Sequence, residues 1–331
     1  MSVRILTEGE LRDCARLDTR AVDTIAGAFT ALHRVEAVMP PVLSMDLAEL
    51  NAEVDIKTAW MRGLDHFAVK ISSGFFNNAE LGLPSLSGMM ALLDARTGRA
   101  SAALLDNGWL TDLRTAAAGG VAARYLARAD AATAAIIGTG LQARLQLEAL
   151  TLVRPIHQAL IWGRNPDSAR ACAEDCARTL GLDVQATDDV VAAVQAADIA
   201  VTTTPARAPI LPAAALHPGL HITAMGSDAP EKNELEPEIL GRADIVVCDR
   251  QAQCERIGEL RSALAAGVVA TDARLPEIGA IAAGEHPGRE HDQQITVADL
   301  TGTGVQDTAI AALALELANE RGHGTTIDTH Q

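Results

Sequence analysis

The sequence is poor in basic residues and in aromatic residues. Its 27 lysines and arginines stand against 43 aspartates and glutamates, so the formal net charge is −16, and only 2% of the residues are aromatic. A chain this acidic repels polyphosphates and anionic lipids, so neither nucleic acid nor a membrane surface is an expected partner. An anionic small-molecule substrate would therefore need a local basic pocket.

Long apolar runs and dense cysteines are also missing. No uninterrupted apolar run reaches the roughly 18 residues of a membrane span, and the first residues lack the apolar segment of a secretory signal, so we expect a cytoplasmic protein. The five cysteines are too sparse for a disulfide framework, and we expect reduced, buried thiols. Neither they nor the nine histidines stand at spacings typical of metal ligands, so no metal site is expected.

The chain contains enough apolar material for a sizeable core. Apolar residues make up 48% of its 331 positions, which excludes a disordered chain and fits about two domains. Thr7 and Glu10 form a capping-box pattern that predicts a helix start, and apolar residues on one face predict a second helix over 22–32. Between about residues 42 and 110, short apolar runs with a hairpin turn at Thr97-Gly98 predict an antiparallel sheet.

From about residue 130 the pattern alternates between strand and helix. Apolar strands are predicted at 134–137, 158–162, 198–203, 220–225 and 243–248, with Ala-rich helical stretches between several of them. Such alternation is typical of a doubly wound parallel sheet covered by helices on both faces. A last helix is predicted from Thr308 to Glu320, and the polar tail 322–331 is expected to be frayed. We predict an α/β protein with an α+β domain (1–120 with 305–331) and a Rossmann dinucleotide-binding domain (121–304).

A glycine motif follows the first strand of the alternating region. The stretch 134–143 reads as an apolar strand that runs into G-x-G-x-x-A and then a helix. Gly138 allows the tight turn, Gly140 lets a pyrophosphate approach the backbone, and Ala143 permits close packing of helix on strand. This context favours dinucleotide binding over a purely structural turn.

The end of the next strand sets the choice between NAD and NADP. An acidic residue there would bind the ribose 2′-hydroxyl, whereas an arginine would tolerate a 2′-phosphate. The sequence has Gly163-Arg164-Asn165 and no acid at this place. Arg164 by itself leans toward NADP, although it can also lie against adenine or be a solvated residue at a helix entry.

Seven stretches together carry a resemblance to a known family. They are Val69-Lys70, Leu83-Pro84, Asp94–Gly98, Leu110–Ala117, Gly138–Gln142, Ala224–Asp228 and Asp299–Asp307. On these stretches the chain resembles the ornithine cyclodeaminase/mu-crystallin family over nearly its whole length. That family includes cyclodeaminases, alanine dehydrogenase, imine reductases and a hormone-binding crystallin. Within it, the sequence is most similar to the ectoine-utilisation subgroup and to iminosuccinate reductase.

The resemblance implies an assembly and a cofactor. It implies a homodimer in which the N-terminal domains, each completed by the C-terminal helix, join their sheets across the interface, so this domain is expected to bind substrate and to dimerise. It also implies NADH, whereas Arg164 taken alone favours NADP. We expect NAD(H), with NADP(H) as the alternative.

Arg114 and Lys70 are the first two expected catalytic residues. Arg114 precedes an Ala-rich helical stretch, where a cation opposes the helix dipole, which argues against a purely structural surface arginine. The resemblance implies that its planar guanidinium binds the substrate α-carboxylate. Lys70 ends a strand-like apolar run, where a lone cation needs an anion to meet it. The resemblance implies that Lys70 stabilises that carboxylate and transfers a proton, and a solvated strand-end lysine is the alternative.

Asp228 and Lys57 complete the expected polar groups. Asp228 follows an apolar strand at the edge where ligands bind in open α/β sheets, and the resemblance implies that it meets the substrate nitrogen. Its alternative is a turn or helix cap. Lys57 matches a second family cation, with an exposed lysine as its alternative. The polar segment 72–78 stands where the family's cyclodeaminases carry an Asn-Gly-His-Pro type segment.

That departure disfavours a cyclodeaminase. Ser72 and Asn77 are instead expected to hold a second substrate carboxylate together with Lys57, although loops are rich in such residues anyway. The residues expected to contact the cofactor are Thr115, Gly138, Thr139, Gly140, Leu141, Gln142, Arg164, Thr203, Met225 and Gly226.

These expectations define one hypothesis and three alternatives. We expect an NADH-dependent imine reductase that converts iminosuccinate to L-aspartate by hydride transfer to C2 of a protonated imine. The alternatives are an ornithine cyclodeaminase with tightly bound NAD, an alanine dehydrogenase-like enzyme, and a non-catalytic ligand-binding protein. Retention of Lys70, Arg114 and Asp228 argues against the last of these.

Overall fold

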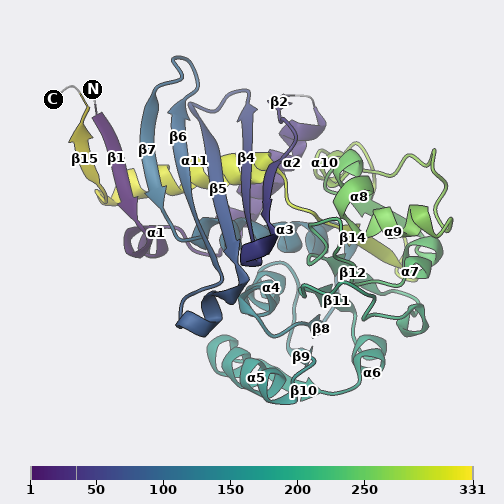
Figure 1. Cartoon of the computed structure of the whole chain (residues 1–331). Coiled ribbons are helices and arrows are strands. Elements are labelled where there is room, and N and C mark those ends of the chain that lie inside the picture. Colours follow the sequence, from purple (N-terminus) through teal and green to yellow (C-terminus); the bar gives the residue numbers. More distant parts are fainter. Residues whose placement is uncertain (1, 35, 330–331) are drawn as a thin grey trace. The chain divides into compact units, whose positions relative to one another are not determined.

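The computed structural model describes residues 2–34 and 36–329, and the chain forms two compact units (Figure 1). The first unit consists of Met1–Arg16, Asp23–Arg114 and Thr303–Gln331, and the second of Leu17–Val22 and Thr115–Gly302. The chain thus changes unit after Arg114 and after Gly302, whereas the sequence pattern suggested changes after residues 120 and 304. The first of these changes lies within α3 (Trp109–Leu126), whose residues from Thr115 on belong to the second unit, and the second lies just before α11 (Gly304–Arg321).

The sheet of the first unit has eight strands. Its order is β15 (Thr325–Asp328), β1 (Ser2–Thr7), β7 (Ala100–Leu105), β6 (Leu86–Asp94), β5 (His66–Phe75), β4 (Ala52–Met61) and β2 (Ala37–Val38), with β3 (Leu43–Leu47) also paired to β4. All neighbours are antiparallel except β1 and β7, which run parallel. The antiparallel sheet predicted for residues 42–110 is confirmed, since β3 to β7 pair only antiparallel with one another, and the pair of β1 and β7 makes the whole sheet mixed.

Two strands at one edge lie outside the predicted region. β1 precedes the predicted capping box and was not anticipated, and β15 lies in the tail that was expected to be frayed. The prediction of a frayed tail was wrong for residues 325–328, because they pair with residues 2–5 from the other end of the chain. The capping box itself is confirmed: the Thr7 side chain accepts the Glu10 N–H at the start of α1 (Glu8–Cys14).

Helix α11 packs along the central strands of this sheet. Figure 1 shows it crossing β4 and β5, and Val305 and Ala309 join Ala59 and Met61 in a buried apolar cluster. Helix α2 (Thr19–His33) contributes Ala28 and Leu32 to the same cluster. The short helices η1 (Ala48–Leu50) and η2 (Phe76–Leu81) lie in the connections of the sheet.

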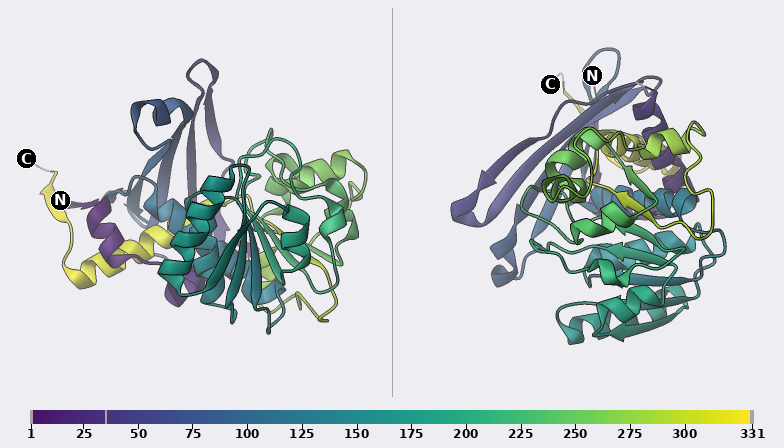
Figure 2. Two further views of the ribbon diagram at one scale, coloured as in Figure 1. Left: turned by 90° about the horizontal axis from the view of Figure 1, so that it is seen from below. Right: turned by 90° about the vertical axis from the view of Figure 1, so that its right-hand side faces the viewer.

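The second unit has a seven-stranded, entirely parallel sheet. Its order is β10 (Asp183–Thr187), β9 (Gln158–Trp162), β8 (Thr133–Ile137), β11 (Ile199–Thr202), β12 (His221–Ala224), β14 (Thr296–Asp299) and β13 (Ile245–Cys248). Its helices are α4 (Leu141–Thr151), α5 (Pro166–Leu180), α6 (Val190–Gln195), η3 (Ala213–Ala215), α7 (Pro237–Arg242), α8 (Gln251–Ile257), α9 (Glu259–Ala265) and α10 (Ile278–Ala282). Figure 2 shows helices flanking this sheet.

This order is the doubly wound arrangement that the alternating pattern predicted. All five predicted strands of this region are present, whereas β10 and β14 were not predicted. β10 is a polar edge strand, and only two of the four residues of β14 are apolar. The order of the strands reverses between β8 and β11, because β9 and β10 lie on one side of β8 and the later strands lie on the other. Ligands of such sheets bind at the carboxyl ends of the strands at this switch point.

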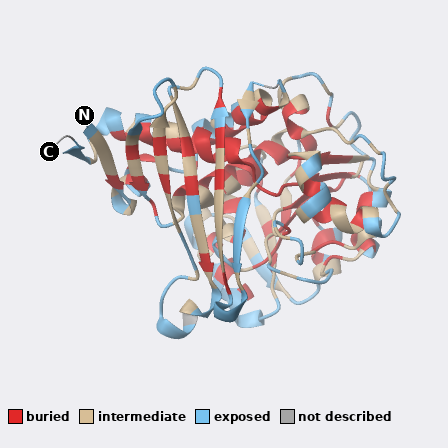
Figure 3. Ribbon diagram, turned by 45° about the horizontal axis from the view of Figure 1, so that its top comes forward, coloured by how far each residue is buried: buried red, intermediate tan, exposed pale blue. Residues whose placement is uncertain are grey.

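Buried residues are concentrated in the central strands of the parallel sheet and on α11, whereas the strands of the first unit are mostly intermediate or exposed (Figure 3). In the second unit, two apolar clusters pack on the sheet, one around Ile136, Leu147 and Ile161 and the other around Ile137, Ile222 and Val297. All five cysteines are free and buried, as predicted. Within the described part of the chain, no helix is long and apolar enough to cross a membrane.

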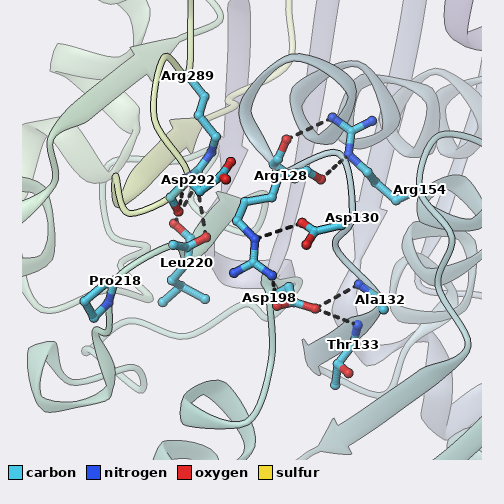
Figure 4. Close-up of polar contacts among 12 residues, drawn as sticks. Arg128, Asp130, Ala132, Thr133, Arg154, Asp198, Pro218, Leu220, Arg289 and Asp292 are labelled. Atoms are coloured by element: carbon cyan, nitrogen blue, oxygen red, sulfur yellow. Dashed lines mark hydrogen bonds and ion pairs between the residues drawn. The ribbon is translucent and has the colours of Figure 1, made fainter.

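Arginines satisfy the carbonyl groups at the end of α3. Arg154 donates to the carbonyl oxygens of Arg124, Ala127 and Arg128, at 2.7, 2.9 and 2.7 Å (Figure 4). The Arg128 guanidinium in turn binds Asp198, whose carboxylate accepts the N–H groups of residues 132 and 133. Guanidinium donors at a helix C-terminus offset the unpaired carbonyls and the negative end of the dipole. Because this network lies at the amino ends of the strands, we interpret it as structural.

Candidate active site

Two lysines face each other across β4 and β5. Lys57 and Lys70 are directly opposite in the antiparallel register, so both side chains emerge on the same face of the sheet. They are only 8% and 2% exposed. Like charges directly opposite one another are destabilising, and buried charges require partners. This face of the sheet therefore needs an anion.

Asp307 of α11 supplies that anion. Its Oδ2 lies 3.2 Å from Lys70 Nζ, and its Oδ1 accepts a hydrogen bond from Arg114 Nε at 3.0 Å. Asp307 is 1% exposed and Arg114 7%. Since all four residues belong to the first unit, the sheet, α3 and α11 together assemble a buried cluster of three cations around one carboxylate, which we call the Asp307 cluster.

Two residues of α11 position Asp307 against the sheet. A Cβ at Gly304 would lie 2.5 Å from the Thr58 carbonyl oxygen, so only glycine lets the helix start approach β4 this closely. The Thr308 hydroxyl donates to the Ala59 carbonyl at 2.6 Å and accepts the Ala68 N–H at 3.1 Å. It therefore ties α11 to both strands that carry the lysines. In the sequence, Asp307 is the last residue of a stretch that carries the family resemblance, and no role was predicted for it.

Arg114 lies inside a helix, not at its start. The expectation that it precedes the helix was wrong, because α3 begins at Trp109, where Asp106 Oδ2 accepts the Leu110 N–H at 2.8 Å. The argument from an unfavourable position at the helix start therefore does not apply. Its burial and its bond to Asp307 are instead the observations that favour a function for Arg114.

Burial and mutual repulsion shift the pKa values in the Asp307 cluster. Burial, together with the charges of Arg114 and Lys57, lowers the pKa of Lys70 to about 7, although Asp307 opposes this shift. Burial acts to raise the pKa of Asp307, but Lys70, Arg114 and Lys57 outweigh it and hold that pKa below its usual value. Burial raises the pKa of Asp106 to about 6. Lys70 can therefore exchange a proton near neutral pH while Asp307 stays ionised.

Ser72 and Asn77 lie at different distances from Lys70. β5 continues to Phe75, so Lys70 lies within the strand instead of ending it, and Ser72 is the next residue on the same face. Asn77 lies in η2, and five extended residues from Lys70 to Phe75 already span about 16 Å. Its side chain is exposed and pairs with Asn51 at 2.9 Å. The structure brings Ser72, but not Asn77, toward the lysine pair.

The glycine loop of the second unit has the geometry of a phosphate-binding turn. Gly138 has φ of +140°, and a Cβ there would lie 2.2 Å from the Thr203 hydroxyl. Gly140 is the N-cap of α4 and makes no side-chain cap, and no atom lies within 4 Å of where its Cβ would be. The first N–H groups of α4 thus meet open space next to a bare backbone, an arrangement that fits a pyrophosphate.

The other expected cofactor residues line the same edge of the sheet. Gly138, Thr139, Arg164, Thr203, Met225 and Gly226 follow the carboxyl ends of β8, β9, β11 and β12. Gln146 connects two more of them, because its amide donates to the Thr115 carbonyl at 3.0 Å and to Gln142 Oε1 at 3.3 Å. Leu141 is 48% exposed, and Arg164 is exposed just before the N-cap Asn165 of α5.

Two residues that connect the loops at this edge of the parallel sheet were not predicted from the sequence. Arg144 donates to the carbonyl oxygens of Thr139 and Gly140 at 2.8 and 3.1 Å. Glu234 is fully buried and accepts hydrogen bonds from Thr202, Thr204 and the Gly226 N–H, at 2.6 to 2.8 Å. It therefore joins the segments after β11 and β12, which carry Thr203 and Gly226. No local pattern marks Glu234, since its partners lie up to 32 residues away.

Asp228 lies in the second unit, four residues beyond the end of β12. It is exposed, and its Oδ1 lies 2.6 Å from Lys232 Nζ. The chain thus carries its expected anion-binding groups in the first unit and its expected iminium partner in the second.

Comparison with known proteins gives one family and several close relatives. Residues 3–322 match the model of the ornithine cyclodeaminase/mu-crystallin family. A protein of Sinorhizobium fredii, named as an uncharacterised cyclodeaminase, is 53% identical over 99% of both chains.

Two solved structures are similar over nearly the whole chain. The Δ1-pyrroline-2-carboxylate reductase of Thermococcus litoralis, in complex with NADH and L-proline, has a TM-score of 0.93 at 30% identity and covers 98% of this chain and 100% of its own. The iminosuccinate reductase of Paracoccus denitrificans, in complex with NAD+, has a TM-score of 0.91 at 32% identity and covers 99% and 100%. These relatives agree with the predicted fold class, enzyme class and nicotinamide cofactor.

Proposed function

This chain belongs to the ornithine cyclodeaminase/mu-crystallin family, as the sequence analysis predicted, and from that premise we propose that it is an NADH-dependent imine reductase that converts iminosuccinate to L-aspartate. The observation that carries this proposal is the Asp307 cluster, in which Lys57, Lys70 and Arg114 surround a single carboxylate in a buried site. A site of this kind attracts carboxylates in a protein whose overall charge repels them.

Each cation has a distinct task in this proposal. Arg114 uses its Nε for Asp307, and its two terminal nitrogens bind the substrate α-carboxylate together with Lys70. Lys57 stands across the strand pair from Lys70 and receives the second carboxylate of a dicarboxylic imine, with the Ser72 hydroxyl on the same face. Asn77, which the sequence suggested as a further ligand of the second carboxylate, has no role in this proposal, because the extended end of β5 separates it from Lys70.

The second unit supplies the cofactor site. The uncapped start of α4 and the bare backbone at Gly140 would hold the pyrophosphate, and Thr203 and Gly226 would border the nicotinamide end. When bound, NADH supplies the hydride that reduces C2 of a protonated imine. Asp228 stabilises the iminium and then the ammonium product by its charge. Lys70, with its pKa near neutrality, provides or accepts a proton beside the carboxylate.

The comparisons favour two further substrates as candidates. The similarity to Δ1-pyrroline-2-carboxylate reductase favours a cyclic imine with one carboxylate. A relative named as an uncharacterised cyclodeaminase keeps cyclodeamination as the other candidate, for which ornithine is the test substrate. In both cases Lys57 would have no second carboxylate to bind, so its replacement separates these candidates from iminosuccinate.

NADH oxidation with a panel of imines tests the proposal. The substrates are iminosuccinate, Δ1-pyrroline-2-carboxylate, and pyruvate with ammonium, and L-ornithine is assayed for ammonia release. We expect the highest kcat/KM with iminosuccinate. Lys57→Met should lower that value by about tenfold or more and spare the monocarboxylic imines, whereas Lys57→Arg should retain it. Equal loss on all substrates would refute the role of Lys57, and ammonia release from ornithine without net redox change would refute the reductase.

We also propose that the chain forms a homodimer through the sheet of the first unit. Several large apolar side chains there are 48 to 74% exposed, namely Leu43, Met45, Leu81, Leu83 and Leu86. Monomers rarely expose so many together. Light scattering on the purified chain should give twice the monomer mass, and Leu83→Glu with Leu86→Glu should shift it toward the monomer. A monomeric wild type would refute this proposal.

A further inference from the structure

Two cysteines and a carboxylate meet at one edge of the parallel sheet in the second unit. Cys248 ends β13 and Asp299 ends β14, and the two residues are directly paired in the register. Cys254 lies on α8. The two Sγ atoms and one carboxylate oxygen lie within 4.8 Å of one another, and all three residues are 0% exposed.

The carboxylate of Asp299 is only partly satisfied. Its Oδ2 accepts the Leu260 N–H at 2.9 Å, whereas Oδ1, buried within the described structure, has no hydrogen-bond partner there. Gly258 leaves room for this carboxylate, since a Cβ at that position would lie 2.5 to 2.7 Å from both oxygens. A buried carboxylate oxygen without a partner is costly and needs an explanation.

The surroundings are acidic. Asp249 and Glu259 are also buried, and Asp249 Oδ1 lies 3.4 Å from Cys254 Sγ. Among the described residues, no lysine or arginine forms an ion pair with Asp249, Glu259 or Asp299. A cation at this place would therefore relieve a buried negative field.

We propose that Cys248, Cys254 and Asp299 bind one divalent cation with thiolate affinity, of the Zn²⁺ class. Two sulfurs and one oxygen are a ligand set that suits Zn²⁺, and a water would complete the tetrahedron, because both carboxylate oxygens of Asp249 already accept hydrogen bonds from residues 250, 301 and 302. With Zn–S bonds of about 2.3 Å, neighbouring sulfurs of a tetrahedral site stand about 3.8 Å apart, so the ligand atoms need to close by at most about 1 Å.

Cation binding releases one proton from each of the two thiols, and one more from Asp299 when its carboxyl group is protonated. The cation would cross-link β13, β14 and α8. Spacing along the chain predicted no metal site, because Asp299 follows Cys254 by 45 residues. This inference does not rest on the proposed reductase function.

Cobalt binding tests the inference on the full chain. We would strip the protein with a chelator under reducing conditions and titrate it with Co²⁺, which gives a sulfur-to-metal charge-transfer band in the near ultraviolet when thiolates bind it. We expect one equivalent per chain and a rise in melting temperature with Zn²⁺. Cys254→Ser should remove the band. Cys172→Ser, which alters a buried cysteine on α5 in the same unit, should keep it.

Asp299→Asn provides a variant that retains the shape of the site. It should weaken Co²⁺ binding by at least tenfold and abolish the Zn²⁺-dependent rise in melting temperature, with an unchanged circular dichroism spectrum and unchanged NADH binding. The inference is overturned if wild type shows no charge-transfer band, if the band persists in Cys254→Ser, or if Cys172→Ser also loses it.

Discussion

Replacing Asp307 by asparagine removes the only carboxylate found in direct contact with Lys70 and Arg114 in the described structure. The change keeps the size of the side chain, but it abolishes the ion pair to Lys70 at 3.2 Å and turns one oxygen into an amide donor. Breaking a buried ion pair by removing one partner costs about 3–5 kcal/mol. For a domain of this size, that corresponds to a fall in melting temperature of roughly 10 °C.

The pH dependence of this loss has a defined sign. Asp307 raises the pKa of Lys70, so in the variant this pKa falls further below about 7. Between the lowered pKa and pH 7, Lys70 is therefore neutral in the folded variant but protonated in the unfolded chain. The folded variant then gains stability relative to wild type as pH rises toward neutrality. The destabilisation should therefore be largest near pH 5.5 and smaller at pH 8.

Denaturant unfolding at these two pH values measures both effects. Asp13→Asn is a matched control, because Asp13 also contacts two basic residues of the first unit, Arg321 at 3.0 Å and His323 at 2.9 Å, but at the surface. It should change stability far less. A loss in Asp307→Asn no greater than in Asp13→Asn, or a loss that grows with pH, would refute our account of the Asp307 cluster.

Three further substitutions test the other sites. Arg114→Ala should lower kcat/KM by about 100-fold or more through loss of charge-assisted bonds, while NADH affinity measured by fluorescence stays within about threefold; equal loss of both would contradict a role in substrate binding. Glu234→Gln leaves the donors of Thr202, Thr204 and Gly226 with one acceptor fewer, so the NADH Kd should rise about tenfold, and an unchanged Kd would show that Glu234 does not shape the cofactor edge. Arg164→Ala should raise KM for NADPH by about tenfold and leave that for NADH nearly unchanged; equal effects on both would exclude a contact with the 2′-phosphate.

Local sequence determined much of the second unit. The glycine motif at 138–143, the apolar strands of four to six residues and the helices between them are readable because strand and helix periodicity depend on neighbours in the chain. The capping box at Thr7 and Glu10 is local in the same sense, since its two partners are three residues apart. Lys70, Arg114 and Asp228 were predicted as site residues through motifs that each span only a few residues.

Only the tertiary structure decided how these pieces combine. Asp307 meets Arg114 across 193 positions, and β1 pairs with a strand more than 300 residues further along the chain. Lys57 and Lys70 lie opposite each other because of the strand register. Glu234 and Asp299 are buried because of the way the strands are ordered in the parallel sheet. Such contacts depend on closing long loops and on which faces pack together, and no property of the neighbouring residues encodes them.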